Sequence, residues 1–185
     1  MDDVPGVATC VGLLRGVNVG GRNRVPMKEL VALVEALGGR RVRTYIQSGN
    51  VIFDAPPELR QRAATALAEA ITERFGVTTP VVLRTAGELA DVVGGNPYLA
   101  EDADEGTLHV GFLAEPPRPE NVATLDPRRS PPDEFTLVGR EIYLRCPNGV
   151  ARSKLTNAYF DSRLGTVSTM RNWRTVRKLL ELAES

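Results

Sequence analysis

The stretch Val42-Arg43-Thr44-Tyr45-Ile46-Gln47-Ser48-Gly49-Asn50-Val51-Ile52-Phe53 decides which fold class the chain belongs to. It contains two short runs rich in β-branched and aromatic residues, Val42–Gln47 and Val51–Phe53, on either side of the compact turn Ser48-Gly49-Asn50. This pattern predicts two strands that pair as a hairpin. The segments before and after it show how the hairpin is built into a larger sheet.

The hairpin is flanked in both directions by a helix and then by an apolar strand. On the N-terminal side, Thr9–Leu14 predicts a buried strand, and a helix begins near Pro26 and ends at Gly38-Gly39. On the C-terminal side, Glu58–Phe75 predicts a helix and Pro80–Arg84 a strand. The order strand, helix, strand, strand, helix, strand is that of a ferredoxin-like half, the split βαβ arrangement.

The remainder of the chain repeats this order with one exception. We expect a short helix near Ala86–Val93 and then a loop, Gly94–Gly106. A strand follows at Leu108–Leu113, a helix at Pro119–Leu125, and a hairpin formed by Phe135–Val138 and Glu141–Arg145. Two closing helices are expected at Lys154–Leu164 and Met170–Ala183. A helix thus stands where a fourth strand would belong. We expect an α+β fold of two ferredoxin-like (βαββα-type) halves with antiparallel sheets covered by helices: residues 1–93, a linker at 94–106, and 107–185. The matching order suggests a duplication, although the two halves show no visible similarity in sequence.

The composition is that of an ordinary globular chain. Of 185 residues, 42% are hydrophobic and 25% are charged, which fits neither a disordered nor a membrane-spanning class. The acidic start Met1-Asp2-Asp3 does not fit a secretory signal, and no apolar run approaches the ~18 residues of a membrane span. Cys10 and Cys146 lie far apart and form no CxxC motif, which favours reduced thiols over a redox pair. We therefore expect a cytoplasmic protein without membrane contact.

The zero net charge conceals two oppositely charged segments. Residues 88–134 contain 11 acids and 3 bases, whereas residues 152–178 contain 7 bases and 1 acid. The loops at Arg15–Arg24 and Arg40–Arg43 each contain three arginines and no acid. A purely structural explanation is that the acidic middle and the basic tail neutralise each other.

The connection Arg15–Val25 is the strongest candidate for a functional surface. Its 11 residues include three glycines, two asparagines and three arginines, and two to six residues are usual between a strand and a helix. Glycines allow backbone N–H groups to be exposed, and a helix beginning near Pro26 adds a positive dipole end, which together suit phosphate or carboxylate. The loop matches neither the Walker A nor the GxGxxG pattern. A compact loop whose asparagines satisfy its own turns is an equally valid interpretation.

Cations at two predicted helix starts form a second unusual feature. Ser153 and Thr169 could cap the last two helices, and Arg152, Lys154, Arg171 and Arg174 surround these starts. Cations at a helix N-terminus oppose the macrodipole. Either a bound anion or a carboxylate from the acidic middle segment would compensate that cost.

Recognisable catalytic signatures are absent from the sequence. His109 is the only histidine and lies within an apolar run, which favours a buried structural imidazole over a general base. One histidine and two distant cysteines offer no zinc-site spacing. The acidic run Glu101–Glu105 lacks the pattern of a calcium loop and indicates a solvated turn. The strand Thr9–Leu14 has no aromatic residue for base stacking, so the sequence does not favour sequence-specific nucleic-acid recognition.

Four separated blocks of sequence carry a family resemblance: Leu13–Met27, Thr44–Val51, Ser153–Ala158 and Thr169–Val176. With these blocks in this order, the chain resembles the bacterial proteins grouped as domain of unknown function 1697, over nearly its whole length. Near the positions of Arg22 and Arg24 that family usually has lysine, so the arginines of this chain carry the same positive charge. The resemblance implies two ferredoxin-like halves and no activity.

Our leading hypothesis is a protein that binds a phosphorylated or otherwise anionic small molecule, without a cofactor or metal. The candidate ligand-binding residues combine the Arg/Gly/Asn loop, the hairpin tip and the two basic helix starts, and they are Arg15, Asn18, Gly20, Gly21, Asn23, Arg24, Gln47, Ser48, Asn50, Arg152, Ser153, Lys154, Asn157, Arg171, Asn172 and Arg174. This hypothesis assumes that the loop and the helix starts meet in space. The alternatives are a structural or protein–protein interaction module and, third, an enzyme acting on a phosphorylated metabolite.

Overall fold

The computed structural model describes residues 6–100 and 103–185. The expectations for Met1-Asp2-Asp3 and for Glu101 and Asp102 lie outside the described residues. The chain divides into two compact units. Unit 1 runs up to Ala90 and also takes in Leu179–Ser185, and unit 2 comprises Asp91–Lys178.

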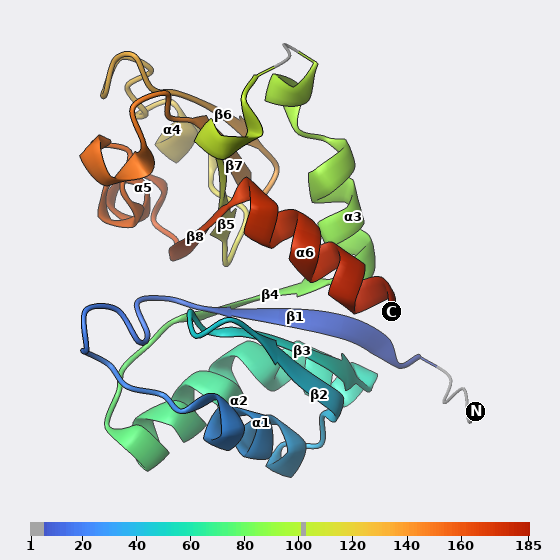
Figure 1. Ribbon diagram of the computed structural model, residues 1–185. Coiled ribbons are helices and arrows are strands. Elements are labelled where there is room, and N and C mark those ends of the chain that lie inside the picture. The colour runs from blue at the N-terminus through green and yellow to red at the C-terminus, as the bar shows by residue number, and fades with distance from the viewer. Residues whose placement is uncertain (1–5, 101–102) are drawn as a thin grey trace. The chain divides into compact units, whose positions relative to one another are not determined.

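Unit 1 is a four-stranded antiparallel sheet with two helices on one face (Figure 1). Its elements are β1 (Ala8–Leu14), α1 (Met27–Ala36), β2 (Arg40–Tyr45), β3 (Asn50–Ala55), α2 (Pro57–Phe75), β4 (Val81–Thr85) and the start of α3 (Ala86–Gly94). The strand order is β2-β3-β1-β4. This confirms the hairpin and the ferredoxin-like order predicted for the first half.

One hydrophobic core joins this sheet to α1 and α2. Leu30 and Val34 lie four residues apart on α1, and Leu59, Ala63 and Leu67 follow the same spacing on α2. All five side chains pack in one cluster with the helix-facing residues of β1 and β3. Burying one such aliphatic side chain stabilises the fold by roughly 1.5–3 kcal/mol, so these two stripes hold the helices to the sheet.

Unit 2 repeats this plan with a second four-stranded sheet, ordered β6-β7-β5-β8. Its elements are the end of α3, the 3-10 helices η1 (Pro97–Leu99) and η2 (Glu105–Thr107), β5 (Leu108–Leu113), α4 (Pro119–Val122), β6 (Glu134–Val138), β7 (Glu141–Arg145), η3 (Val150–Arg152), α5 (Asn157–Leu164), β8 (Ser168–Asn172) and the start of α6 (Trp173–Glu184). The helix α5 packs its Tyr159, Phe160 and Leu164 into a cluster with β7.

The two units agree residue by residue in strand register. Val11 of β1 pairs with Arg84 of β4, and Val110 of β5 pairs with Arg171 of β8. Both arginines are buried, and each donates from Nη1 to the carbonyl of the preceding residue, at 2.8 Å for Arg84 and 2.9 Å for Arg171.

The helix that follows each of these strands is capped in the same way. The side-chain oxygen of the last strand residue accepts the N–H three positions later, in Thr85 with Glu88 and in Asn172 with Thr175. The two units are therefore built on one plan.

The prediction that unit 2 ends without a fourth strand was wrong. Residues 168–172 form β8, which pairs with β5 from Ser168↔Leu113 to Asn172↔His109. Thr169 therefore lies in a strand, and Asn172 caps α6 in its place. The polar sequence of β8 concealed it, because Ser168, Thr169 and Arg171 are buried in spite of their polarity.

The expected helix start at Ser153 was also wrong. The helix α5 begins at Asn157, and Thr156 is its cap, accepting the N–H of Tyr159 at 3.2 Å. Ser153 instead has extended backbone and accepts the N–H of Leu155. Within the described residues, no helix is both long and apolar enough to span a membrane.

Candidate functional site

The 15–25 loop forms a small hairpin of its own. Val19 and Arg22 form an isolated bridge, and the N–H of Arg22 donates to the carbonyl of Val19 at 3.0 Å. The two residues between them, Gly20 and Gly21, have φ of +56° and +75°. Two successive positive φ angles are what a type I′ turn requires, and glycine adopts them without a steric cost.

Buried valines and asparagine side chains hold this loop in place. Val17 and Val25 are buried in the core of unit 1. Asn18 donates from Nδ2 to the carbonyls of Val25, at 2.9 Å, and of Gln47, at 2.8 Å, and it accepts the N–H of Val25 at 2.9 Å. Asn23 donates to the carbonyl of Gly16 at 3.0 Å. The hydrogen bonds of both asparagine side chains thus fix the loop.

The arginines of the loop differ in how far they are exposed. Arg22 and Arg24 are exposed, and neither forms an ion pair within the described residues. Arg15 is half-buried, and its backbone is fixed by the carbonyl of Pro80 and by the hydroxyl of Thr79. Two free guanidinium groups therefore stand on a fixed backbone.

The hairpin tip at residues 46–49 adjoins the loop. The Asn18–Gln47 hydrogen bond connects the two segments, and the N–H of Leu14 donates to the carbonyl of Gly49 at 2.8 Å. A Cβ on Gly49 would lie 2.5 Å from a methyl group of Val17, so the close approach requires glycine. Ile46 has a φ of +49°, which for a β-branched residue is a genuine outlier.

The polar residues predicted at this tip play different roles. Asn50 is fully buried and donates to the carbonyl of Tyr45 and to Oγ of Ser48. Gln47 is exposed and Ser48 is half-buried. Asn50 is therefore a structural residue, whereas Gln47 and Ser48 border the loop surface.

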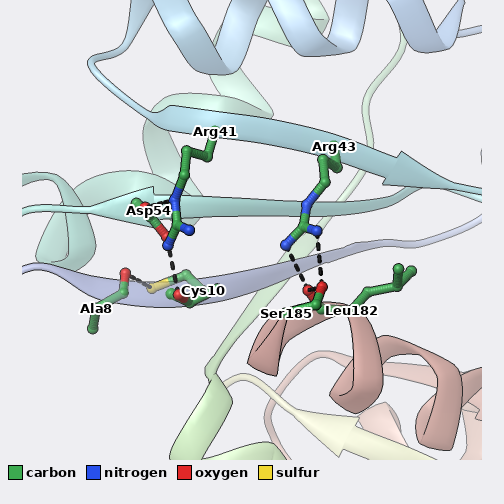
Figure 2. A network of polar contacts seen from close by, with 8 residues as sticks. Ala8, Cys10, Arg41, Arg43, Asp54, Leu182 and Ser185 are labelled. Carbon is green, nitrogen blue, oxygen red and sulfur yellow. Dashed lines mark hydrogen bonds and ion pairs between the residues drawn. The ribbon is translucent and has the colours of Figure 1, made fainter. Parts of the chain in front are cut away.

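Two of the three arginines of β2, Arg41 and Arg43, are held by internal contacts (Figure 2). Arg41 forms an ion pair with Asp54, and Arg43 donates to the carbonyl of Leu182 and to Oγ of Ser185. Burial raises the pKa of Asp54, but the hydrogen bonds from Arg41 and Thr9 outweigh it and bring the pKa below its ordinary value. This second arginine cluster therefore stabilises unit 1.

The remaining predicted residues lie in unit 2, and several have structural roles. Arg171 is 9% exposed, and burial lowers the pKa of its guanidinium to about 10. Asn157 accepts from the buried hydroxyl of Ser168, and Asn172 caps α6. Ser153 is buried.

Three cations of unit 2 remain on its surface. Arg152, Lys154 and Arg174 are exposed, and none forms an ion pair within the part of the chain that the structure describes. The meeting of these residues with the loop of unit 1 stays a prediction.

Sequence reasoning missed the apolar neighbours of the loop arginines. Val19 is 64% exposed and Ile46 is 50% exposed. A valine beside two glycines and an isoleucine in a strand-like run gave no signal of exposure. The positive φ of Ile46 interrupts the alternation of side chains along the strand, and the Ile46 side chain is exposed.

The titratable groups offer little chemistry elsewhere. Burial raises the pKa of both Cys10 and Cys146 to about 11, which keeps the thiols protonated and unreactive. Burial lowers the pKa of His109, so its imidazole is neutral. In residues 6–100 and 103–185, no group of three His, Cys, Asp or Glu side chains could hold a metal ion.

The fold places the chain in the class of proteins with two ferredoxin-like α+β units. The structure resembles that of the conserved bacterial protein SP0830 from Streptococcus pneumoniae, with a TM-score of 0.73, 20% identity, and coverage of 96% of this chain and 99% of the other. The chain belongs to the family described as protein of unknown function, DUF1697, whose sequence profile matches residues 7–143. A search of curated proteins found no match.

Proposed function

We propose that this protein binds a phosphate-bearing or otherwise anionic small molecule on the 15–25 loop of unit 1. The observation that carries the proposal is the combination of a fixed backbone with two unpaired, exposed guanidinium groups, those of Arg22 and Arg24. An internally fixed loop binds a ligand with less loss of conformational entropy than a mobile one.

A comparison between the two units supports the proposal. The connection from β1 to α1 takes 12 residues, 15–26, whereas the equivalent connection from β5 to α4 takes five, 114–118. The shared plan therefore does not require the long loop. The additional residues are the ones that bring in Gly20, Gly21 and the exposed arginines.

The chemistry of the loop suits an oxyanion. Guanidinium groups form paired hydrogen bonds with phosphate or carboxylate oxygens. The N–H groups of Gly20 and Gly21 have no acceptor within the described residues, and they lie beside Arg22. The strained φ of Ile46 at the adjoining hairpin tip adds support, because backbone strain of this kind clusters at functional sites.

An interaction module is the second candidate, and the exposed Val19 and Ile46 favour it. Arginine together with exposed apolar side chains is common in protein interfaces. A partner surface that carries carboxylates beside an apolar patch would satisfy both features.

The location of the protein is a separate part of the proposal. Both cysteines are free and buried, and reduced thiols are typical of the cytosol, so we propose a cytoplasmic location.

A thermal-shift comparison tests the proposal. Wild-type protein is heated with ADP, coenzyme A, glucose 6-phosphate or inorganic phosphate at constant ionic strength. We expect at least one probe to raise the Tm, since a ligand at 100 times its Kd stabilises the folded state by about 2.7 kcal/mol. The double variant Arg22→Gln/Arg24→Gln loses most of the shift.

The matched control is Arg118→Gln, at the equivalent connection of unit 2. Arg118 is exposed and forms no ion pair within the described segments, so its replacement leaves the shift unchanged. An unchanged shift in the double variant contradicts the proposal. No shift with any probe, together with self-association that depends on Val19 and Ile46, favours the interaction module.

A further inference from the structure

Two arginines of unit 2 approach a single aromatic ring. The guanidinium carbon of Arg129 lies 5.0 Å from the ring centroid of Tyr159, and that of Arg163 lies 6.0 Å from it. Arg163 stands four residues after Tyr159 on α5, whereas Arg129 comes from the loop between α4 and β6. The Tyr159 side chain is anchored, because its hydroxyl oxygen accepts the N–H of Asp126 at 2.8 Å.

The cluster lacks an acidic partner. Neither Arg129 nor Arg163 forms an ion pair in the described part of the chain. Two carboxylates of the same loop accept hydrogen bonds elsewhere: Asp126 accepts the N–H of Arg128, and Asp133 accepts the hydroxyl of Ser130. Both guanidinium groups lie within 6.0 Å of the same ring centroid, and an anion that reached both would be attracted to each.

A third cation and a hydroxyl donor belong to the segments that form this cluster. The N–H of Lys154 donates to Oγ of Ser130 at 3.0 Å, so the exposed Lys154 adjoins the segment that carries Arg129. The hydroxyl of Tyr159 accepts from Asp126, and its own hydrogen has no acceptor among the residues described. A phenolic O–H can donate and accept at once.

We infer that Arg129, Arg163, the hydroxyl of Tyr159 and Lys154 form a second anion-binding site, for a compact ligand with several phosphate groups. The site lies in unit 2 and does not depend on the loop of unit 1. The Tyr159 residue is 8% exposed, so a nucleic-acid base cannot stack on its ring. The ligand is therefore recognised through its phosphates, by guanidinium forks and one O–H donor.

Isothermal titration with inorganic tripolyphosphate tests this inference. The titration uses full-length Arg22→Gln/Arg24→Gln protein, so that binding at the loop of unit 1 is removed. We expect saturable binding with one ligand per chain. Adding Arg129→Met/Arg163→Met, which keeps an apolar side chain over the ring and removes both charges, weakens binding at least tenfold. Tyr159→Phe weakens it about threefold to tenfold, as expected for one hydrogen bond to a charged group.

Arg118→Met serves as the control for the loss of one surface charge of unit 2, and its affinity stays within twofold. The inference is overturned if tripolyphosphate does not bind the folded Arg22→Gln/Arg24→Gln protein. It is also overturned if Arg129→Met/Arg163→Met lowers the Tm but leaves the affinity unchanged, because the arginines would then merely cover the ring. Titration of wild-type protein separates the two proposals. Two ligands per chain support both sites, whereas a single ligand per chain whose binding needs Arg129 and Arg163 but not Arg22 and Arg24 supports this site and contradicts the one in unit 1.

Discussion

Burial decides the chemistry of individual residues, and the two cysteines illustrate this. Both are fully buried, and burial is the largest cause that raises the pKa of each thiol to about 11. The neighbouring carboxylate of Asp133 raises the pKa of Cys146 further. A thiolate is the reactive species, so neither residue is suited to redox chemistry in the folded protein.

Thiol titration checks this conclusion. Because pH 7.5 lies far below a pKa of about 11, both thiols stay protonated. We therefore expect the native protein to react with Ellman's reagent slowly, over hours or longer. Both thiols react within minutes once guanidinium chloride unfolds the chain. Rapid reaction of one thiol in the native protein would contradict the account.

Arg171 and Arg174 are the same residue type and lie three positions apart, but the structure gives them different roles. Arg171 is buried in β8, and Arg174 is exposed on α6. Replacing Arg171 with alanine leaves buried hydrogen-bond acceptors without a donor, so we expect the free energy of unfolding to fall by roughly 2–4 kcal/mol. Arg174→Ala should change it by less than about 0.5 kcal/mol. Urea denaturation followed by circular dichroism measures both, and equal effects would contradict a structural role for Arg171.

At the scale of elements, Asn18 joins the loop of unit 1 to the hairpin tip. Its side chain forms three hydrogen bonds at 2.8–2.9 Å, and its φ is +55°. Asn18→Ala loses the hydrogen bonds and adds the cost of a left-handed backbone, whereas Asn18→Gly loses the hydrogen bonds alone. We expect Asn18→Ala to be less stable than Asn18→Gly by about 1 kcal/mol.

Both Asn18 variants should also weaken anion binding, since the loop is no longer fixed. Denaturant titration measures the stability difference, and the thermal shift with the best phosphate probe measures binding. If both variants bind the anion as tightly as wild-type protein does, preorganisation of the loop contributes nothing to the affinity.

Much of this element structure could be predicted from the sequence, because local patterns determine it. The alternation and turn at Val42–Phe53 predicted β2 and β3, and helical spacing predicted α1 and α2. β8 escaped prediction because its residues are polar and its burial depends on pairing with β5, about 60 positions away. The cap of α5 was placed at Ser153, but the helix begins at Asn157, directly after its cap Thr156.

The candidate site was predictable to a similar degree. The length and the charge of the 15–25 loop identified it, and its glycines indicated positive φ. The roles of the asparagines depend on contacts across the fold, such as that of Asn18 with Gln47, 29 positions apart. The contact of Arg129 with the ring of Tyr159 could not be predicted from a local pattern, because it joins two separate segments of the chain.

At the scale of the whole molecule, the repeated plan allows each unit to serve as a reference for the other. The matched Val–Arg register and the matched helix caps define what the fold needs. A structural feature that one unit has and the other lacks is not required by the fold and is therefore a candidate for function. The long loop of unit 1 and the paired arginines on Tyr159 in unit 2 are both features of this kind.

Anion binding by the 15–25 loop would be visible at its glycine amides in a ¹H–¹⁵N NMR titration. Gly139, a glycine of unit 2 with positive φ in the turn between β6 and β7, serves as an internal control for effects of salt. As the phosphate probe with the largest thermal shift is added, we predict saturable shifts of the amides of Gly20 and Gly21 in wild-type protein and their loss in Arg22→Gln/Arg24→Gln. Amides of Gly20 and Gly21 that do not move, or that move no more than that of Gly139, would contradict anion binding at the loop.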